Sequence, residues 1–210
     1  MERFIVEKSG RWGGIYLTQP INGYFNTYYV GYMNEGNPDF LNHLKNTFSR
    51  ADSSTLWNLI NSKEKVVDCL VKDLPEIART ENIARPLCIC VPRSKANMSE
   101  VQMYFRKAIQ DACRKIGMED GSRVIERVKN TCTTHLRNAD VQNNDGPEPY
   151  PGITKDTCAI DMAKIRNRNI ILIDDIYTKG CNIDEDCIQT LLNAGAQQVI
   201  FYAIAYTKRK

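Results

Sequence analysis

Three continuous runs of apolar residues mark the second half of the chain. They cover residues 87–91, 170–173 and 199–206, and the middle run reads Ile-Ile-Leu-Ile. Short runs of this kind are typical of strands that are buried on both faces, as in a parallel sheet covered by helices. The pattern therefore predicts an α/β fold whose sheet contains these three segments.

Between and before these runs, apolar residues recur at the spacing of helices. The last predicted helix begins with Asn182 as N-cap and Glu185 three residues later, which is typical of a capping box, and it ends at Gly195. Ser99 is the predicted N-cap of a helix that runs to about residue 116. Further helices are predicted at residues 39–48, 53–60 and 64–78.

The N-terminal third is less regular. Residues 13–18 and 27–33 have the composition of strands, whereas residues 19–26 are rich in turn-forming residues. The sequence predicts two strands joined by a turn-rich connection.

Candidate chemistry lies at the carboxyl end of the 170–173 strand. Asp174 and Asp175 stand there, followed by a loop at residues 178–182 and the start of a helix. Backbone N–H groups at a helix N-terminus attract anions, phosphate above all. Adjacent carboxylates would repel a bare phosphate but can hold sugar hydroxyls beside it. The combination points to a ribose 5-phosphate moiety; the alternative is a strand that ends in a solvated Asp-Asp turn.

A second candidate anion site follows the 87–91 strand. Its turn carries Arg93, Ser94 and Lys95. A basic turn after a parallel strand lies at the edge of the sheet where open α/β folds bind ligands. The alternative is an ordinary solvated turn.

The segment 170–182 resembles the phosphoribosyl-pyrophosphate (PRPP) binding motif of type I phosphoribosyltransferases. An apolar run precedes two acids, and Asp174, Asp175, Thr178 and Gly180 match the motif. Lys179 stands where Thr or Ser is usual, and Asn182 where Thr is usual. The resemblance covers about residues 37–210 and is strongest after residue 85.

This resemblance implies a type I phosphoribosyltransferase fold, with a central parallel sheet flanked by helices. A small hood would come from residues 1–36, and residues 37–210 would form the core. In such an enzyme a nitrogen nucleophile attacks C1 of PRPP and pyrophosphate leaves. By position in the motif, Asp174 and Asp175 would hold the ribose hydroxyls. The 5-phosphate would be held by Thr178, Lys179, Gly180, Cys181 and Asn182, and the pyrophosphate by Arg93, Ser94 and Lys95.

The resemblance also implies a flexible flap at about residues 118–153 that closes over PRPP. This stretch is polar and turn-prone. Arg127, Lys129 and Thr131 look similar to a segment of the amidophosphoribosyltransferase-like branch related to the competence protein ComF. Arg127 or Lys129 would then stabilise the leaving pyrophosphate. The expected cofactor is Mg²⁺, held mainly by substrate oxygens and water rather than by a protein cage.

Composition and charge limit the partners and the cellular compartment to be expected. A net charge of +3 is too small to argue for nucleic acid, and no apolar stretch approaches the ~20 residues that span a bilayer. The eight cysteines form no Cys-x-x-Cys pair, so buried free thiols in a reducing compartment are expected. We therefore expect a cytoplasmic protein, with a homodimer as a candidate assembly.

Two alternatives to an enzyme stay open at this stage. One is a regulator that senses PRPP or a nucleotide with a pocket that has lost turnover. The other is a DNA-processing or defence accessory protein, which the ComF resemblance allows and the charge distribution does not support. The acceptor of the phosphoribosyl group is not predicted beyond a nitrogen nucleophile.

Overall fold

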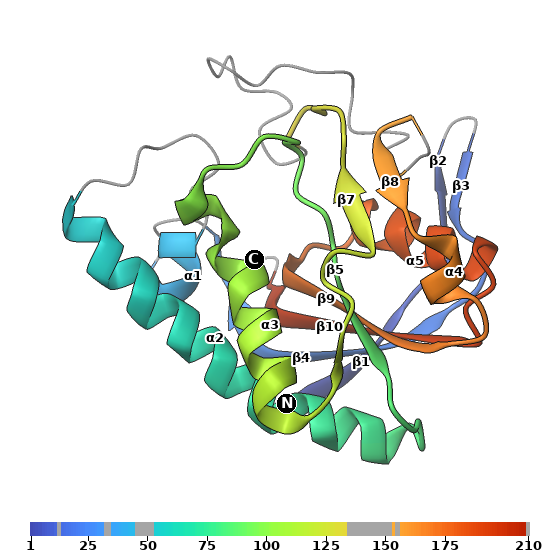
Figure 1. Ribbon diagram of the computed structural model, residues 1–210, viewed down its shortest axis with the longest axis horizontal. Coiled ribbons are helices and arrows are strands. Elements are labelled where there is room, and N and C mark those ends of the chain that lie inside the picture. The colour runs from blue at the N-terminus through green and yellow to red at the C-terminus, as the bar shows by residue number, and fades with distance from the viewer. Residues whose placement is uncertain (12–13, 32–34, 45–52, 134–152, 154–155, 209–210) are drawn as a thin grey trace.

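The computed structural model describes residues 1–11, 14–31, 35–44, 53–133, 153 and 156–208. Its centre is a sheet of six strands in the order β1-β4-β10-β9-β5-β6 (Figure 1). The pairs from β4 to β6 are all parallel, and β1 runs antiparallel to β4 at one edge. The α/β class is therefore confirmed, and the sheet is mixed rather than purely parallel. The strands are β1 (Glu2–Val6), β4 (Ile21–Tyr29), β5 (Leu87–Cys90), β6 (Glu119–Asp120), β9 (Asn169–Tyr177) and β10 (Gln198–Thr207).

Two small hairpins and six helical segments complete the described fold. One hairpin pairs β2 (Ser9–Arg11) with β3 (Gly14–Leu17), and the other pairs β7 (Ile125–Arg127) with β8 (Cys158–Ile160). The helices are α1 (Asp39–Leu44), α2 (Ser53–Thr80), the 3₁₀ helix η1 (Glu100–Met103), α3 (Tyr104–Ile116), α4 (Met162–Ile165) and α5 (Ile183–Asn193). No helix in the described part of the chain is long and apolar enough to cross a membrane.

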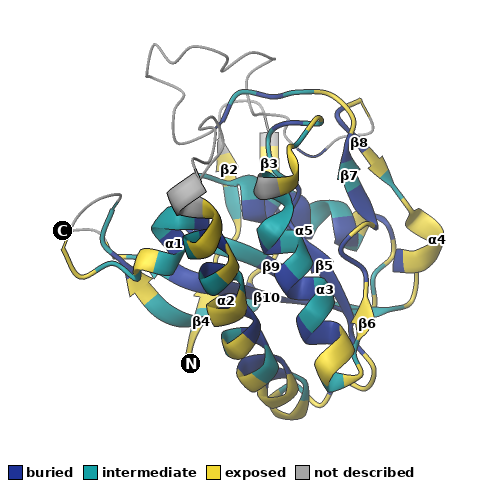
Figure 2. Ribbon diagram, turned by 60° about the vertical axis from the view of Figure 1, so that its left-hand side comes forward, coloured by how far each residue is buried: buried dark blue, intermediate teal, exposed yellow. Residues whose placement is uncertain are grey.

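Helices cover both faces of the sheet, which explains the continuous apolar runs. Ile171 and Ile173 of β9 pack in the cluster that contains α2 and α3, while Ile170 and Leu172 pack in the cluster that contains α5. Successive side chains of a strand point to opposite faces, so a strand between two helical layers must be apolar at every position. Buried residues therefore concentrate along the strands and on the inner sides of the helices (Figure 2).

The prediction for the N-terminal third is wrong in one respect. Residues 19–26, expected to be a turn-rich connection, lie mostly in β4, which pairs with β10 inside the central sheet. The polar residues that suggested turns have distant partners: the Asn22 amide donates to Glu81, and the Asn26 amide to Asp73. Gly23 leaves room for the Phe4 ring, because a Cβ there would lie 2.7 Å from it. Residues 13 and 32–33 of the two predicted strands lie outside the described residues.

The hood expected from residues 1–36 is likewise only partly a separate structure. Both β1 and β4 belong to the central sheet, and the β2–β3 hairpin stands apart from that sheet, with β3 packed against α5. The place of β4 in the sheet cannot be recognised from local pattern, because it lies between β1 and β10, the last strand of the chain.

Two predicted helices are a single one. The 28-residue α2 runs through residues 61–63, where the sequence is polar. Two of these polar side chains have tertiary partners: Ser62 contacts Nδ1 of His43 at 3.1 Å, and the Lys63 ammonium donates to Asp111 at 2.7 Å. These contacts hold the helix continuous across a stretch that local periodicity divides.

Candidate functional site

The candidate site lies where the order of strands reverses. From β5 the chain passes through α3 to β6 on one side, whereas from β9 it passes through α5 to β10 on the other side. The two crossovers therefore leave a crevice outside the carboxyl ends of β5 and β9, the usual ligand position in open α/β sheets. A pocket of about 180 Å³ occupies this position.

Five segments line this pocket. They are the turn after β5, the end of β9, the start of α5, the end of β7 with the chain that follows it, and the first turn of α3. The polar and thiol-bearing lining residues are Arg93, Ser94, Arg127, Thr131, Cys132, Thr133, Asp174, Asp175, Thr178, Cys181 and Asp184. An apolar part of the wall is formed by Val91, Pro92, Phe105, Ile176 and Ile183.

The two acids reach the pocket from opposite faces of β9. The strand continues through both of them to Tyr177, so it does not end before Asp174 as the apolar run suggests. The Asp174 side chain lies within hydrogen-bonding range of Asp184 of α5, on one face of the sheet. Asp175 interacts electrostatically with Arg93. Both carboxyl groups line the pocket because it lies beyond the end of the sheet, where either face opens into it.

Two arginines form the basic wall. Arg93 donates from Nη1 to the Gln102 carbonyl at 3.0 Å, and its own carbonyl accepts from Nε of Arg127 at 3.0 Å. Burial lowers the pKa of both guanidinium groups, and for Arg93 the carboxylates of Asp175 and Asp174 oppose that shift. Arginine stays protonated in proteins, so both groups carry positive charge into the pocket.

The turn after β5 and the chain after β7 are joined by hydrogen bonds. Ser94 accepts from the Thr131 backbone N–H at 2.8 Å, and the side chains of Ser94 and Thr133 are hydrogen-bonded at 2.8 Å. The Ala96 N–H donates to the Asn130 side chain at 3.0 Å. Lys95, predicted to contact an anion, is 8% exposed, and its ammonium group donates to the Thr131 carbonyl at 3.2 Å.

The predicted flap is therefore partly built into the fold. Within residues 118–133, β6 belongs to the central sheet, β7 pairs with β8, and residues 130–133 dock on the turn after β5. Residues 134–152 of the predicted flap lie outside the described residues.

The loop between β9 and α5 differs from its prediction. Asn182 has φ of 62° and makes no side-chain cap; its amide donates to the Gly180 carbonyl at 3.3 Å. Glu185 accepts from the Tyr177 hydroxyl at 2.9 Å, with both side chains buried, so the expected capping box is wrong. Burial and the Glu185 charge raise the pKa of Tyr177 far above its usual value. The Thr178 hydroxyl is hydrogen-bonded to that of Thr207 at 2.6 Å.

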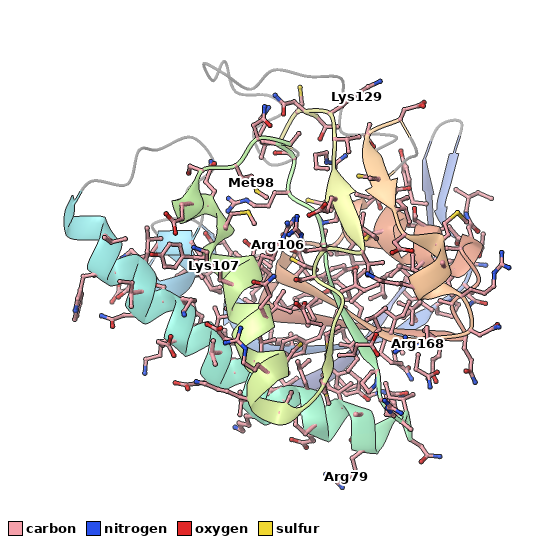
Figure 3. The ribbon with its side chains drawn as sticks, viewed as in Figure 1. Arg79, Met98, Arg106, Lys107, Lys129 and Arg168 are labelled. Carbon is pink, nitrogen blue, oxygen red and sulfur yellow. The ribbon has the colours of Figure 1, made fainter. Side chains whose placement is uncertain are left out.

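The structure thus brings together some predicted site residues and separates others. The pocket lining includes Arg93, Ser94, Arg127, Asp174, Asp175, Thr178 and Cys181, and does not include Lys95, Lys129, Lys179, Gly180 or Asn182. Lys129 is exposed and lies on the surface (Figure 3). Residues that are two apart on a regular strand would share a face. Here β7 ends at Arg127, and the N–H groups of Val128 and Lys129 both donate to the Thr157 carbonyl, so the strand alternation does not continue to Lys129.

Sequence reasoning missed Asp184 and Thr133 as lining residues. A signal for Asp184 was present, because it stands three, four and seven residues before Cys187, Ile188 and Leu191, which form the buried stripe of α5. A carboxyl group on that stripe must face the sheet. Thr133 carried no such signal, since its position depends on the docking of its segment.

Comparisons with known proteins add no relatives. No protein-family model matches the chain, and no curated protein matches it.

Proposed function

We propose that this protein binds PRPP with Mg²⁺ and transfers the phosphoribosyl group to a nitrogen nucleophile with release of pyrophosphate, on a type I phosphoribosyltransferase fold. The observation that carries the proposal is the pocket at the strand reversal, which is lined by Asp174, Asp175, Arg93 and Arg127 together. The motif resemblance and the described topology both support it.

The division of charge in the pocket fits a ligand with two different ends. The turn after β5 and the end of β7 supply the cations, whereas β9 and α5 supply the acids. A diphosphate would lie against Arg93 and Arg127, and ribose hydroxyls would donate to the carboxylates. Charge-assisted hydrogen bonds of both kinds are stronger than neutral ones.

The expected reaction needs little covalent chemistry from the protein. Positive character grows at C1 of the ribose while negative charge grows on the departing pyrophosphate. Buried guanidinium groups would stabilise that developing charge, because they are already held in position before the reaction. Arg127, which is 6% exposed and held by the Arg93 carbonyl, suits this role better than the exposed Lys129.

The proposed cofactor is Mg²⁺, held mainly by substrate oxygens and water. Among the described residues, no group of three or more His, Cys, Asp or Glu side chains is arranged to hold a metal. Mg²⁺ keeps several waters and commonly binds through substrate phosphates. It would neutralise diphosphate charge that the two arginines leave uncompensated.

Addition of PRPP with Mg²⁺ should raise the melting temperature of the protein. Ligand at ~100 times its dissociation constant stabilises the native state by about 2.7 kcal/mol. Differential scanning fluorimetry with PRPP, ribose 5-phosphate and pyrophosphate tests this, with adenine alone as the control. The absence of any shift with all three phosphate ligands would refute the proposed site.

Arg127→Met should weaken pyrophosphate binding about ten- to a hundredfold. The reason is the loss of one or more charge-assisted hydrogen bonds, each worth about 1.5–3 kcal/mol. Lys129→Met is the matched control. It also removes one positive charge, but Lys129 is two residues further along the chain and does not line the pocket. Titration calorimetry distinguishes the two. Equal losses in both variants would show a diffuse electrostatic effect instead of a contact by Arg127.

Turnover separates an enzyme from a PRPP sensor. A screen of nitrogen acceptors for PRPP-dependent release of pyrophosphate should find at least one active acceptor. PRPP binding without release for any acceptor would instead support the sensor.

A further inference from the structure

Asp184 is a buried acid that belongs to no part of the recognised motif. It lies in the first turn of α5, is 3% exposed and lines the pocket. Its side chain lies within hydrogen-bonding range of that of Asp174, while its buried Oδ1 atom has no hydrogen-bond partner among the described residues. A second acid is thus in direct contact with the first acid of the motif.

A hydrogen bond between two carboxyl groups requires a proton. Two ionised carboxylates are acceptors only, so one member of the pair must carry an O–H to donate. Burial disfavours the charged form of an acid, and Asp184 is the more buried of the two residues. Burial therefore favours a proton on Asp184, with the Asp174 carboxylate as its acceptor.

The neighbours of this pair favour the same arrangement. The acidic groups that act on Asp184 are Asp174 and Asp175 of β9 and Glu185 beside it, and all of them oppose its ionisation. Burial is the largest cause of the raised pKa of Asp184. The cations Arg93 and Arg127 reach the pocket from other elements, the turn after β5 and the end of β7.

We propose that Asp184 keeps its proton in the folded protein and, as a positioning residue, holds the Asp174 carboxylate in place while remaining neutral beside the phosphate-binding loop. An ionised Asp184 would place a negative charge in the first turn of α5, where a phosphate is expected. The neutral form removes that repulsion. Only the consequence for ligand binding rests on the proposed function; the shared proton does not.

The direct test is the protonation state in the ligand-free protein. Carbon NMR of ¹³C-labelled Asp carboxyl groups, with Asp184 assigned by its loss in Asp184→Asn, should show a protonated Asp184 at about pH 7. An ionised Asp184 carboxyl at that pH would overturn the inference.

Stability provides a second readout that needs no ligand. An acid whose pKa is raised by folding makes the native state less stable as pH rises from its unfolded pKa towards its folded pKa, because the unfolded state ionises first. Asp184→Asn removes this loss, so its melting temperature should fall less than that of the wild type between about pH 5 and about pH 8. Asp186→Asn is the control: it lies in the same turn, outside the pocket lining, and accepts from the Ile153 N–H at 2.7 Å. Equal slopes in the wild type and Asp184→Asn would count against the shared proton.

Ribose 5-phosphate binding tests the consequence. Above the pKa of Asp184, wild-type affinity should fall by up to about tenfold per pH unit relative to Asp184→Asn, since binding then requires uptake of a proton. Ionisation of the phosphate itself changes the affinity of both proteins equally, so it does not affect the ratio of their affinities. A protonated Asp184 with no ribose 5-phosphate binding in either protein would sustain the shared proton and refute the proposed function. Binding with the same pH dependence in both would overturn the role of Asp184 beside the phosphate.

Discussion

Replacing either Asp174 or Asp175 with Asn should weaken PRPP binding about ten- to a hundredfold and leave pyrophosphate binding nearly unchanged. Each carboxylate is expected to accept a hydrogen bond from a ribose hydroxyl, and a hydrogen bond to a charged group contributes about 1.5–3 kcal/mol. Pyrophosphate has no ribose and should contact Arg93 and Arg127, which line the same pocket from the turn after β5 and the end of β7. The difference between the two ligands therefore isolates the role of the acids.

Titration calorimetry of both ligands against both variants provides the measurement. Asp186→Asn serves as the control for loss of one nearby negative charge, because Asp186 is not part of the pocket lining. Far-UV circular dichroism of each variant confirms that the fold is retained. A parallel loss of PRPP and pyrophosphate affinity would show that the acids act through the metal or through folding, and the ribose assignment would then be wrong.

Asp73→Ala should lower the free energy of unfolding by about 3–5 kcal/mol. Asp73 is fully buried in α2, where its Oδ2 atom accepts from the Tyr202 hydroxyl and the Asn26 amide, both at 2.8 Å. The substitution leaves two donors without their acceptor, at about 1–3 kcal/mol each, and opens a cavity beneath the sheet. This carboxylate ties α2 to β10 and β4, so its loss weakens the attachment of the helix to the sheet.

Urea unfolding compares this variant with two controls. Asp68→Ala removes an exposed acid from the same helix. It should change the free energy of unfolding by no more than about 0.5 kcal/mol, as is usual for a surface substitution. Asp73→Asn keeps an oxygen acceptor and should cost less than Asp73→Ala, because Tyr202 and Asn26 can still donate to it. A cost for Asp73→Ala no greater than that for Asp68→Ala would show that the buried network contributes nothing to stability.

The sequence predicted well the parts of the fold whose pattern is local. The run at residues 170–173 identified a strand that is buried on both faces. Helices cover both faces of the sheet, so every residue of the strand must be apolar, and this can be seen in the sequence one residue at a time. The strand at residues 87–91 and the helix that ends near residue 116 were located for the same reason. Asp174 and Asp175 could be placed at a carboxyl edge because they directly follow an apolar strand.

Predictions failed where a polar residue has a partner far away in sequence. Asn22 and Asn26 suggested turns, yet they lie in β4 because Glu81 and Asp73 of the α2 region accept their hydrogen bonds. Glu185 suggested a capping box, yet its carboxylate accepts a hydrogen bond from the Tyr177 hydroxyl. Local propensity is a weak preference, and a buried hydrogen bond outweighs it.

By itself, then, the sequence determined the α/β class, the helices and strands of the second half, and two polar segments at one edge of the sheet, since each follows from periodicity and chain order. Only the tertiary structure decided that β4 joins the sheet and that Arg127 rather than Lys129 faces the pocket. It also decided that Lys95 turns to the Thr131 carbonyl and that Asp184 meets Asp174. These outcomes depend on the direction of single side chains and on contacts between distant segments, which are fixed by packing and not by local pattern.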